Sequence, residues 1–393
     1  MQQRLAVPLT IDEIEGVLAP LAHARPLPAR AFLDAGIFEV ERTEVLGRSW
    51  ICVGHADEVA LPGQWVRAIV GGEPVIVIRG PDLRLRGFFD VCQHRGASVV
   101  GRRSCGRAAR LECPYHGWTY ELDGRLVEAP FAPATFDRTD HGLRTVRVDE
   151  WRGLVFVNLD DQARSLVDWL GVTPPWLTEQ VLGSLRRGRR TSYDVEANWK
   201  LLVENFQESH HFPRVHRALE RLTPTQEARS WLTEGPWLGG TMEIEDAETV
   251  SLHGSRHARP YLVPPTGADE RPRVFDAMLF PTLLTSLQPD YLLTYRLTPL
   301  AASRTRVTAD IYFHPAAFVP EFEPRDVYDF WDRVNAEDRA ICEDQQQNAS
   351  SRAFAPACYA TVEEGVHAFD RLVALAHRAH HEREPGRRAE RTP

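Results

Sequence analysis

Two short clusters of cysteine and histidine constrain this chain more than any other feature. The first contains Cys92 and His94, the second contains Cys113 and His116, and 18 residues (95–112) lie between them. Each cluster offers one thiolate and one imidazole. Two such pairs fit a [2Fe–2S] cluster in which the thiolates bind one iron and the imidazoles bind the other. Zinc is the alternative, although structural zinc sites usually pair cysteine with cysteine and histidine with histidine.

The residues around both clusters predict two hairpin loops. Strands are expected at 74–79 and 83–89, on either side of the turn Gly80-Pro81-Asp82, so the second strand leads into the first cluster. Residues 118–121 lead from the second cluster into another turn at 122–124. In this arrangement the cysteines can converge inward while the histidines face outward.

At these residues the sequence resembles the Rieske proteins, and specifically the Rieske non-haem iron oxygenases. The segments that carry the resemblance read Cys92-x-His94-Arg95-Gly96 and Cys-Pro-Tyr-His-Gly-Trp over 113–118. The resemblance implies that Cys92, His94, Cys113 and His116 bind a Rieske [2Fe–2S] cluster.

Composition narrows the class of protein. The chain has 393 residues, enough for two domains, and a net charge of −9, which argues against a nucleic-acid partner. We find no pattern of a secretory signal peptide and no apolar run long enough to span a membrane. Cys52, Cys105, Cys342 and Cys358 are irregularly spaced, so we expect free thiols in a cytoplasmic protein. Cys105 lies between the two clusters but is not expected to be a ligand.

A second candidate metal site lies within residues 198–216, which read NWKLLVENFQESHHFPRVH. Apolar residues recur at helical spacing over 199–206, and Pro213 is expected to end the helix. His211 and His216 follow with a five-residue spacing. Two histidines and a remote carboxylate can form the 2-His-1-carboxylate site of non-haem Fe(II) oxygenases, which leaves open positions for O2.

The resemblance supports this site as well. Glu-x-x-His-x4-His after Asn-Trp-Lys is the iron-site pattern of the oxygenase family, and it places His211 and His216 at the ligand positions. Family members commonly have tyrosine before the first ligand, where this chain has His210. Glu208 matches a carboxylate that in the family accepts a hydrogen bond from the iron-binding histidine and reaches a neighbouring subunit's cluster.

The third iron ligand is expected on a late helix. Residues 327–345 show helical spacing, and the family's motif position falls on Asp338. Glu337, Glu343 and Asp344 are the alternatives, each of which could equally be an exposed helix carboxylate.

These features predict an α+β chain with two main domains. Residues 1–44 are expected to form a helical lead-in that packs on the catalytic domain, and residues 45–160 to form the Rieske β domain. Residues 161–376 are expected to form the catalytic domain, in which strand patterns between 276 and 314 predict an antiparallel sheet with helices. The resemblance implies the helix-grip fold there. Residues 377–393 are predicted to be a disordered tail, because they are rich in charged residues and poor in apolar ones.

The resemblance also implies a function: the oxygenase component of a Rieske-type oxygenase. Such an enzyme uses O2 and electrons from NAD(P)H to hydroxylate or oxidatively dealkylate a small organic substrate. No flavin-binding or nicotinamide-binding signature is visible, so a flavin and iron–sulfur reductase or a ferredoxin is expected on a separate chain. The family's arrangement is a homotrimer in which Glu208 of one subunit approaches His116 of the next.

Local patterns point to a subgroup. Residues 330–332, 351–354 and 369–371, together with glutamate at 208, resemble the oxygenases of glycine betaine, choline, carnitine or stachydrine. A quaternary ammonium substrate would need an aromatic cage. An aromatic-ring cis-dihydroxylating dioxygenase alpha subunit is the nearer alternative, and a Rieske-type electron carrier the more remote one.

Overall fold

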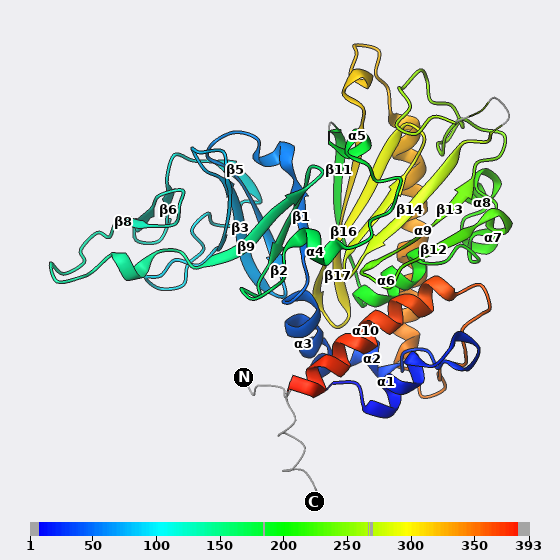
Figure 1. Ribbon diagram of the computed structural model, residues 1–393, viewed down its shortest axis with the longest axis horizontal. Helices are drawn as coiled ribbons and strands as arrows, with labels where there is room; N and C mark the ends of the chain where they lie inside the picture. Colours follow the sequence, from blue (N-terminus) through cyan, green and yellow to red (C-terminus); the bar gives the residue numbers. More distant parts are fainter. Residues whose placement is uncertain (1–7, 184, 266, 268–269, 384–393) are drawn as a thin grey trace, which may run out of the picture. The chain divides into compact units, whose positions relative to one another are not determined.

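The structure, a computed structural model, describes residues 8–183, 185–265, 267 and 270–383. The chain divides into two compact units, one of Leu46–Trp169 and the other of Met1–Val45 with Leu170–Pro393. Each unit contains an antiparallel sheet, and the second unit also carries the long helices, which confirms the α+β class (Figure 1). Within the described residues, no helix combines the length and apolar character needed to cross a membrane.

The smaller unit is built on a seven-stranded sheet of order β1-β10-β9-β4-β3-β2-β5. Its strands are β1 (Ile51–His55), β2 (Gln64–Val70), β3 (Glu73–Arg79), β4 (Leu85–Phe89), β5 (Cys105–Arg107), β9 (Thr145–Trp151) and β10 (Leu154–Asn158). Strand β3 is buried on both faces: Val75 and Val77 join one apolar core, and Ile76 and Ile78 join another. This explains why its sequence is an uninterrupted apolar run rather than an alternating one.

A three-stranded sheet of order β6-β7-β8 completes this unit and carries the second loop. Its strands are β6 (Leu111–Glu112), β7 (Thr119–Tyr120) and β8 (Leu126–Glu128). The predicted domain boundary at 160/161 differs from the structure, which groups residues up to Trp169 with this unit. The reason is local, because Trp50 Nε1 donates a hydrogen bond to the Arg164 carbonyl at 3.1 Å.

The larger unit contains a second seven-stranded antiparallel sheet, of order β11-β17-β16-β15-β14-β13-β12 (Figure 1). Its strands are β11 (Arg186–Val195), β12 (Arg229–Leu232), β13 (Trp237–Glu243), β14 (Arg273–Leu279), β15 (Leu283–Leu287), β16 (Tyr291–Ala301) and β17 (Arg304–Phe313). The central strands β15 and β16 are almost wholly buried.

Helices α6 (Trp199–Phe206), α9 (Arg325–Ala349) and α10 (Glu364–Arg383) belong to the same unit and share its main apolar core. Asn198 begins α6 as its N-cap, with its side chain accepting from the Lys200 N–H at 3.0 Å. The shorter helices of this unit are α1 (Ile11–Leu18), α2 (Arg30–Leu33), α3 (Ala35–Val40), α5 (Glu179–Leu182), α7 (Phe212–Val215) and α8 (Arg217–Leu222).

Two sequence predictions were wrong in this unit. Residues 377–383, expected to be disordered, continue helix α10, because His377 and His380 are buried and anchor its last turns; residues 384–393 lie outside the described part. Pro213 does not end the helix that starts at Trp199. That helix ends at Phe206, and Pro213 lies in the first turn of α7, where a missing N–H costs nothing.

Candidate active site

The two cysteine–histidine loops of the smaller unit have the same backbone turn. The Cys92 N–H donates to the Ala97 carbonyl and the Gly96 N–H returns to the Cys92 carbonyl, at 2.8 and 3.0 Å. In the second loop, the Cys113 N–H donates to the Trp118 carbonyl at 2.8 Å and the Gly117 N–H to the Cys113 carbonyl at 3.0 Å. Gly96 and Gly117 both adopt positive φ, 74° and 70°, which explains a glycine at this position of each loop.

The loops bring together all four predicted cluster residues. Cys92 and Cys113 are each 2% exposed, and the rings of His94 and His116, both exposed, lie 4.6 Å apart between centroids. Burial raises the pKa of the Cys113 thiol, and the adjacent Cys92 thiol raises it further. Two thiols directed inward beside two imidazoles directed outward are the donor set that a Rieske cluster needs and that a zinc site rarely has.

Two further residues support these loops, and the sequence analysis did not identify them. The Tyr120 hydroxyl lies 3.3 Å from Cys92 Sγ and accepts from the Gln93 N–H at 3.0 Å. Asp90 accepts from Arg67 Nε at 2.6 Å and from the Val99 N–H at 2.7 Å. Asp90 follows the end of β4 and lies two residues before Cys92, but a single aspartate there gives no signal that it is buried.

In the larger unit, His211, His216 and Asp338 form a three-residue group whose candidate ligand atoms all lie within 4.8 Å of one another. His211 comes from the turn before α7, His216 from the junction of α7 and α8, and Asp338 from the middle of α9. His216 Nε2 lies 2.7 Å from Asp338 Oδ1, and His211 Nε2 lies 3.7 Å from the same oxygen.

The outer nitrogen of each imidazole is held by a glutamate. His211 Nδ1 lies 2.5 Å from Glu208 Oε1, and His216 Nδ1 lies 2.8 Å from Glu337 Oε2. Each Nε2 is therefore directed toward the common point with Asp338, in the manner of carboxylate–histidine–metal arrangements. Burial lowers the pKa of His216, but Asp338 and Glu337 more than offset this and raise the pKa above its usual value.

The group fits a metal ion. His211 Nε2 is shielded from solvent and has no hydrogen-bond partner in the part of the chain that the structure describes. A buried ring nitrogen without a partner is costly, and a divalent cation held by two imidazoles and one carboxylate would satisfy it. The Asn205 amide fixes Asp338 by donating to Oδ1 at 2.6 Å.

The structure separates Asp338 from its three rivals. Glu337 contacts His216 Nδ1, whereas Asp338 contacts Nε2 of the same ring. Glu337 therefore orients that imidazole and does not face His211. Glu343 accepts from the Glu196 N–H and from Arg339, at 3.1 and 2.9 Å. Asp344 is exposed to solvent.

A pocket in the larger unit reaches this group. Its open volume is about 900 Å³ including the mouth, which is enough for a small organic molecule. Its lining is mainly apolar and includes the aromatic residues Tyr193, Phe206, Phe212, Tyr295 and Trp331.

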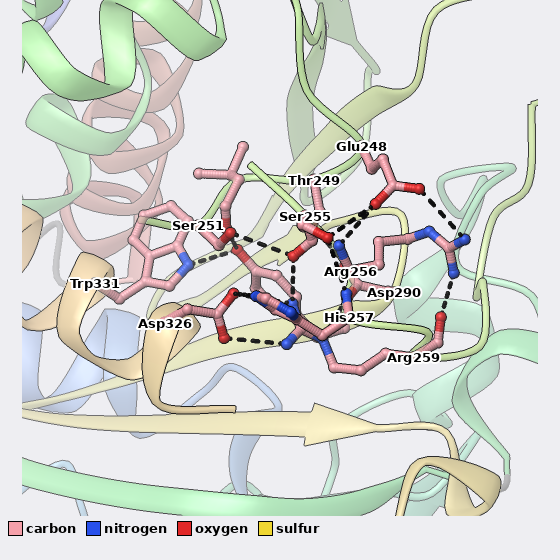
Figure 2. A network of polar contacts seen from close by, with 12 residues as sticks. Glu248, Thr249, Ser251, Ser255, Arg256, His257, Arg259, Asp290, Asp326 and Trp331 are labelled. Atoms are coloured by element: carbon pink, nitrogen blue, oxygen red, sulfur yellow. Dashed lines mark hydrogen bonds and ion pairs between the residues drawn. The ribbon is translucent and has the colours of Figure 1, made fainter. Parts of the chain in front are cut away.

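A buried polar network fixes one wall of this pocket. Arg259 donates to Asp290 at 2.6 Å and to Asp326 at 3.0 Å, and so ties the segment between β13 and β14 to the start of α9 (Figure 2). Trp331 Nε1 donates to the Tyr291 hydroxyl at 2.7 Å, which in turn donates to the Val250 carbonyl at 2.6 Å. Trp331 and Val250 both line the pocket, so the network holds that wall in place. Sequence analysis missed it because its members are spread over about 80 residues without a periodic pattern.

A four-residue thiol–imidazole site in one unit and a 2-His-1-carboxylate pocket in the other define the class: an oxygenase with an iron–sulfur centre and a mononuclear iron centre. Residues 49–147 match the Rieske [2Fe-2S] domain family, and residues 182–377 match the ring hydroxylating alpha subunit (catalytic domain) family. The chain belongs to the Rieske-type non-haem iron oxygenases and is the oxygenase component of such an enzyme.

Relatives at the sequence level include both monooxygenase and dioxygenase subunits, among them a biphenyl dioxygenase subunit alpha of Metapseudomonas furukawaii, 31% identical over 210 residues, covering 50% of this chain and 44% of the relative. The glycine betaine monooxygenase oxygenase subunit of Chromohalobacter salexigens is 29% identical over 374 residues, covering 86% of this chain and 83% of the relative. The carnitine monooxygenase oxygenase subunit of Escherichia coli K12 is 35% identical over 233 residues, covering 57% of this chain and 60% of the relative.

Solved structures agree on the fold. A quaternary ammonium Rieske monooxygenase superposes with a TM-score of 0.79 at 25% identity, over 95% of this chain and all of that one. Naphthalene 1,2-dioxygenase from a Rhodococcus species superposes with a TM-score of 0.75 at 20% identity, over 93% of this chain and 98% of the other, which speaks for the fold alone.

Proposed function

We propose that this chain is the oxygenase subunit of a monooxygenase that hydroxylates or oxidatively N-dealkylates a small quaternary ammonium compound. The observation that carries the proposal is the aromatic-lined pocket that reaches His211, His216 and Asp338. Aromatic faces attract an alkylated ammonium group through cation–π interaction without any N–H donor. The activities named for the relatives above, on glycine betaine and carnitine, support the same substrate class.

The metal assignments are part of this proposal. His211, His216 and Asp338 would hold Fe(II), and Cys92, His94, Cys113 and His116 would hold the Rieske cluster. When bound, the mononuclear iron supplies activation of O2, and the cluster supplies single electrons for it. The protein's part is to align both imidazoles, through Glu208 and Glu337, and to exclude water with the apolar pocket walls.

Glu208 is proposed to link subunits of a homotrimer. Its Oε1 holds His211 in this chain, and in the assembly the carboxylate would also approach the neighbouring subunit's His116. His210 already contacts Glu208 Oε2 through Nδ1 at 2.9 Å, so that ring would have to share this oxygen with the neighbour. A heterologous contact of this kind closes into a ring when the rotation is threefold. Glu208→Gln should keep both metals and slow turnover sharply, and normal turnover in this variant would defeat the bridging role.

We propose that the electrons come from NAD(P)H through a separate reductase or ferredoxin. We also propose that the protein acts in the cytoplasm. None of the six cysteines, all of which lie in the described residues, forms a disulfide in the structure.

A direct test compares substrate classes. The purified protein alone should contain about three irons per chain, two in the cluster and one in the pocket. With a reductase and NADH added, it should convert glycine betaine, choline or carnitine to a dealkylated product with matched O2 consumption. Conversion of small arenes to cis-diols instead would establish the dioxygenase alternative, and iron at two per chain would leave only an electron carrier.

A further inference from the structure

One side of the pocket carries a polar group that the proposed iron site does not use. Asp276 on β14 lies directly opposite Ser286 on β15 in the sheet register, and Gln288 follows two residues later. Gln288 Nε2 donates to Ser286 Oγ at 2.8 Å, and the Ser286 hydroxyl bonds the Asp276 carboxyl. All three residues line the pocket.

This group ends in two oxygen acceptors without partners. Asp276 Oδ1 and Gln288 Oε1 are both shielded from solvent, and neither accepts a hydrogen bond in the described part of the chain. Buried acceptors are normally satisfied, so each such atom needs an explanation. The described pocket residues offer these two oxygens little positive charge. Arg339 is the one arginine or lysine among them, and it donates to Glu343 at 2.9 Å.

Other buried aspartates of the same unit differ from Asp276. Asp310 on β17 is paired with Arg190 at 2.6 Å and with Arg296 at 2.9 Å. Asp290 is paired with Arg259 at 2.6 Å. A carboxylate that only supports the fold is neutralised in this way, whereas no arginine or lysine of the described residues pairs with Asp276. Burial accordingly raises the pKa of Asp276, to about 6.

We propose that Asp276, supported by Ser286 and Gln288, is the specificity-determining residue that receives the positively charged nitrogen of the substrate. The inference rests on the proposed function, because it assigns a counter-charge to the substrate class proposed there. The aromatic rings of the pocket favour any alkylated or aromatic guest, but a buried carboxylate favours a cation over a neutral guest of equal shape. The electrostatic attraction is strong at this position because the surroundings are of low dielectric.

The test measures binding without turnover. Metal-loaded protein is titrated calorimetrically, without O2, with two matched ligand pairs: glycine betaine against 3,3-dimethylbutanoate, and choline against 3,3-dimethyl-1-butanol. Each pair differs only in a quaternary nitrogen replaced by carbon. Asp276→Asn should weaken binding of glycine betaine and choline about tenfold or more, because it removes the counter-charge and keeps the shape. The affinities of the two carbon analogues should not fall by more than about twofold, since neither carries a positive charge for Asp276 to attract. Asp276→Glu, which keeps the charge, should retain much of the preference for the cation.

Three outcomes would overturn the inference: unchanged affinity for the two ammonium ligands in Asp276→Asn, equal weakening of the ammonium ligands and the carbon analogues, or wild-type protein that does not prefer the ammonium ligands. Iron content and circular dichroism of each variant show that the fold and the metal site are intact. The binding measurement and the turnover assay can fail independently of each other. Absence of product with a reductase would count against the monooxygenase activity, while a charge-dependent dissociation constant would still locate a cation site at Asp276.

Discussion

The buried ion pair between Glu41 and Lys200 gives the sharpest stability prediction. Both side chains are 0% exposed, and Lys200 Nζ lies 2.6 Å from Glu41 Oε1. Trp199 Nε1 donates to the other oxygen, Glu41 Oε2, at 2.9 Å. Burial raises the pKa of Glu41, but Lys200 and His377 more than offset this and bring it below the usual value, so the Glu41 carboxylate is charged at neutral pH. The pair joins the segment after α3 to the start of α6.

Lys200→Met keeps the length of the side chain and removes its charge. Glu41 then remains buried with a neutral donor from Trp199 and no full counter-charge, and loss of one partner of such a pair costs about 3–5 kcal/mol. The retained Trp199 hydrogen bond places the expected loss near 3 kcal/mol. For a domain of some 150–250 residues this corresponds to a fall in Tm of about 6–12 °C. In the double variant Glu41→Gln/Lys200→Met no unpaired charge remains, so the loss should be smaller than the sum of the two single losses by about 1–3 kcal/mol.

The assay separates the two units of the chain. Thermal unfolding followed by circular dichroism should show the fall in Tm, while the visible absorbance of the cluster, which reports on Leu46–Trp169, should keep its transition temperature. Glu15→Gln is the matched control. It breaks the Glu15–Arg378 pair at 2.5 Å, whose side chains are 61% and 34% exposed, and an exposed pair contributes about 0–1 kcal/mol. Equal Tm values for Lys200→Met and Glu15→Gln, or strictly additive losses in the double variant, would refute the reasoning.

Three further predictions concern other sites. Asp338→Ala should lower iron content by about one per chain and leave the cluster spectrum unchanged. The control Asp344→Ala, at an exposed position on the same helix, should keep all the iron, and equal iron in both variants would show that Asp338 is not a ligand. Burial raises the pKa of Asp370 to about 7, and among the described residues Glu204 Oε1 and Asp370 Oδ1 have no other hydrogen-bond partner, which fits a shared proton. The protonated form therefore stabilises the fold at low pH, and this contribution is lost as the pH rises through about 7. Asp370→Asn should accordingly flatten the dependence of Tm on pH between about 4 and 7, where only the folded wild type keeps this proton, and an unchanged slope would contradict the assignment. Tyr120→Phe removes the hydroxyl beside Cys92 Sγ and should lower the reduction potential of the cluster, measured by spectroelectrochemistry, with cluster content unchanged; an unaltered potential would exclude that hydrogen bond as a tuning element.

The sequence by itself determined the chemistry that depends on local order. The spacing of Cys92, His94, Cys113 and His116 fixed the candidate donor set, because each pair lies on one short loop whose glycine permits the turn. The strand patterns gave the α+β class for the same reason, since periodicity is a property of contiguous residues.

Only the tertiary structure decided features that depend on residues far apart in the chain. It distinguished Asp338 from Glu337, because adjacent residues on one helix point in different directions and only packing of α9 shows which of them shares a point with His211 and His216. It showed that α10 continues beyond His377, because burial against the N-terminal helix offsets a charged composition. It also showed that Asp276 has no counter-ion among the described residues, which no sequence pattern records, because an unpaired charge is defined by what surrounds it in space.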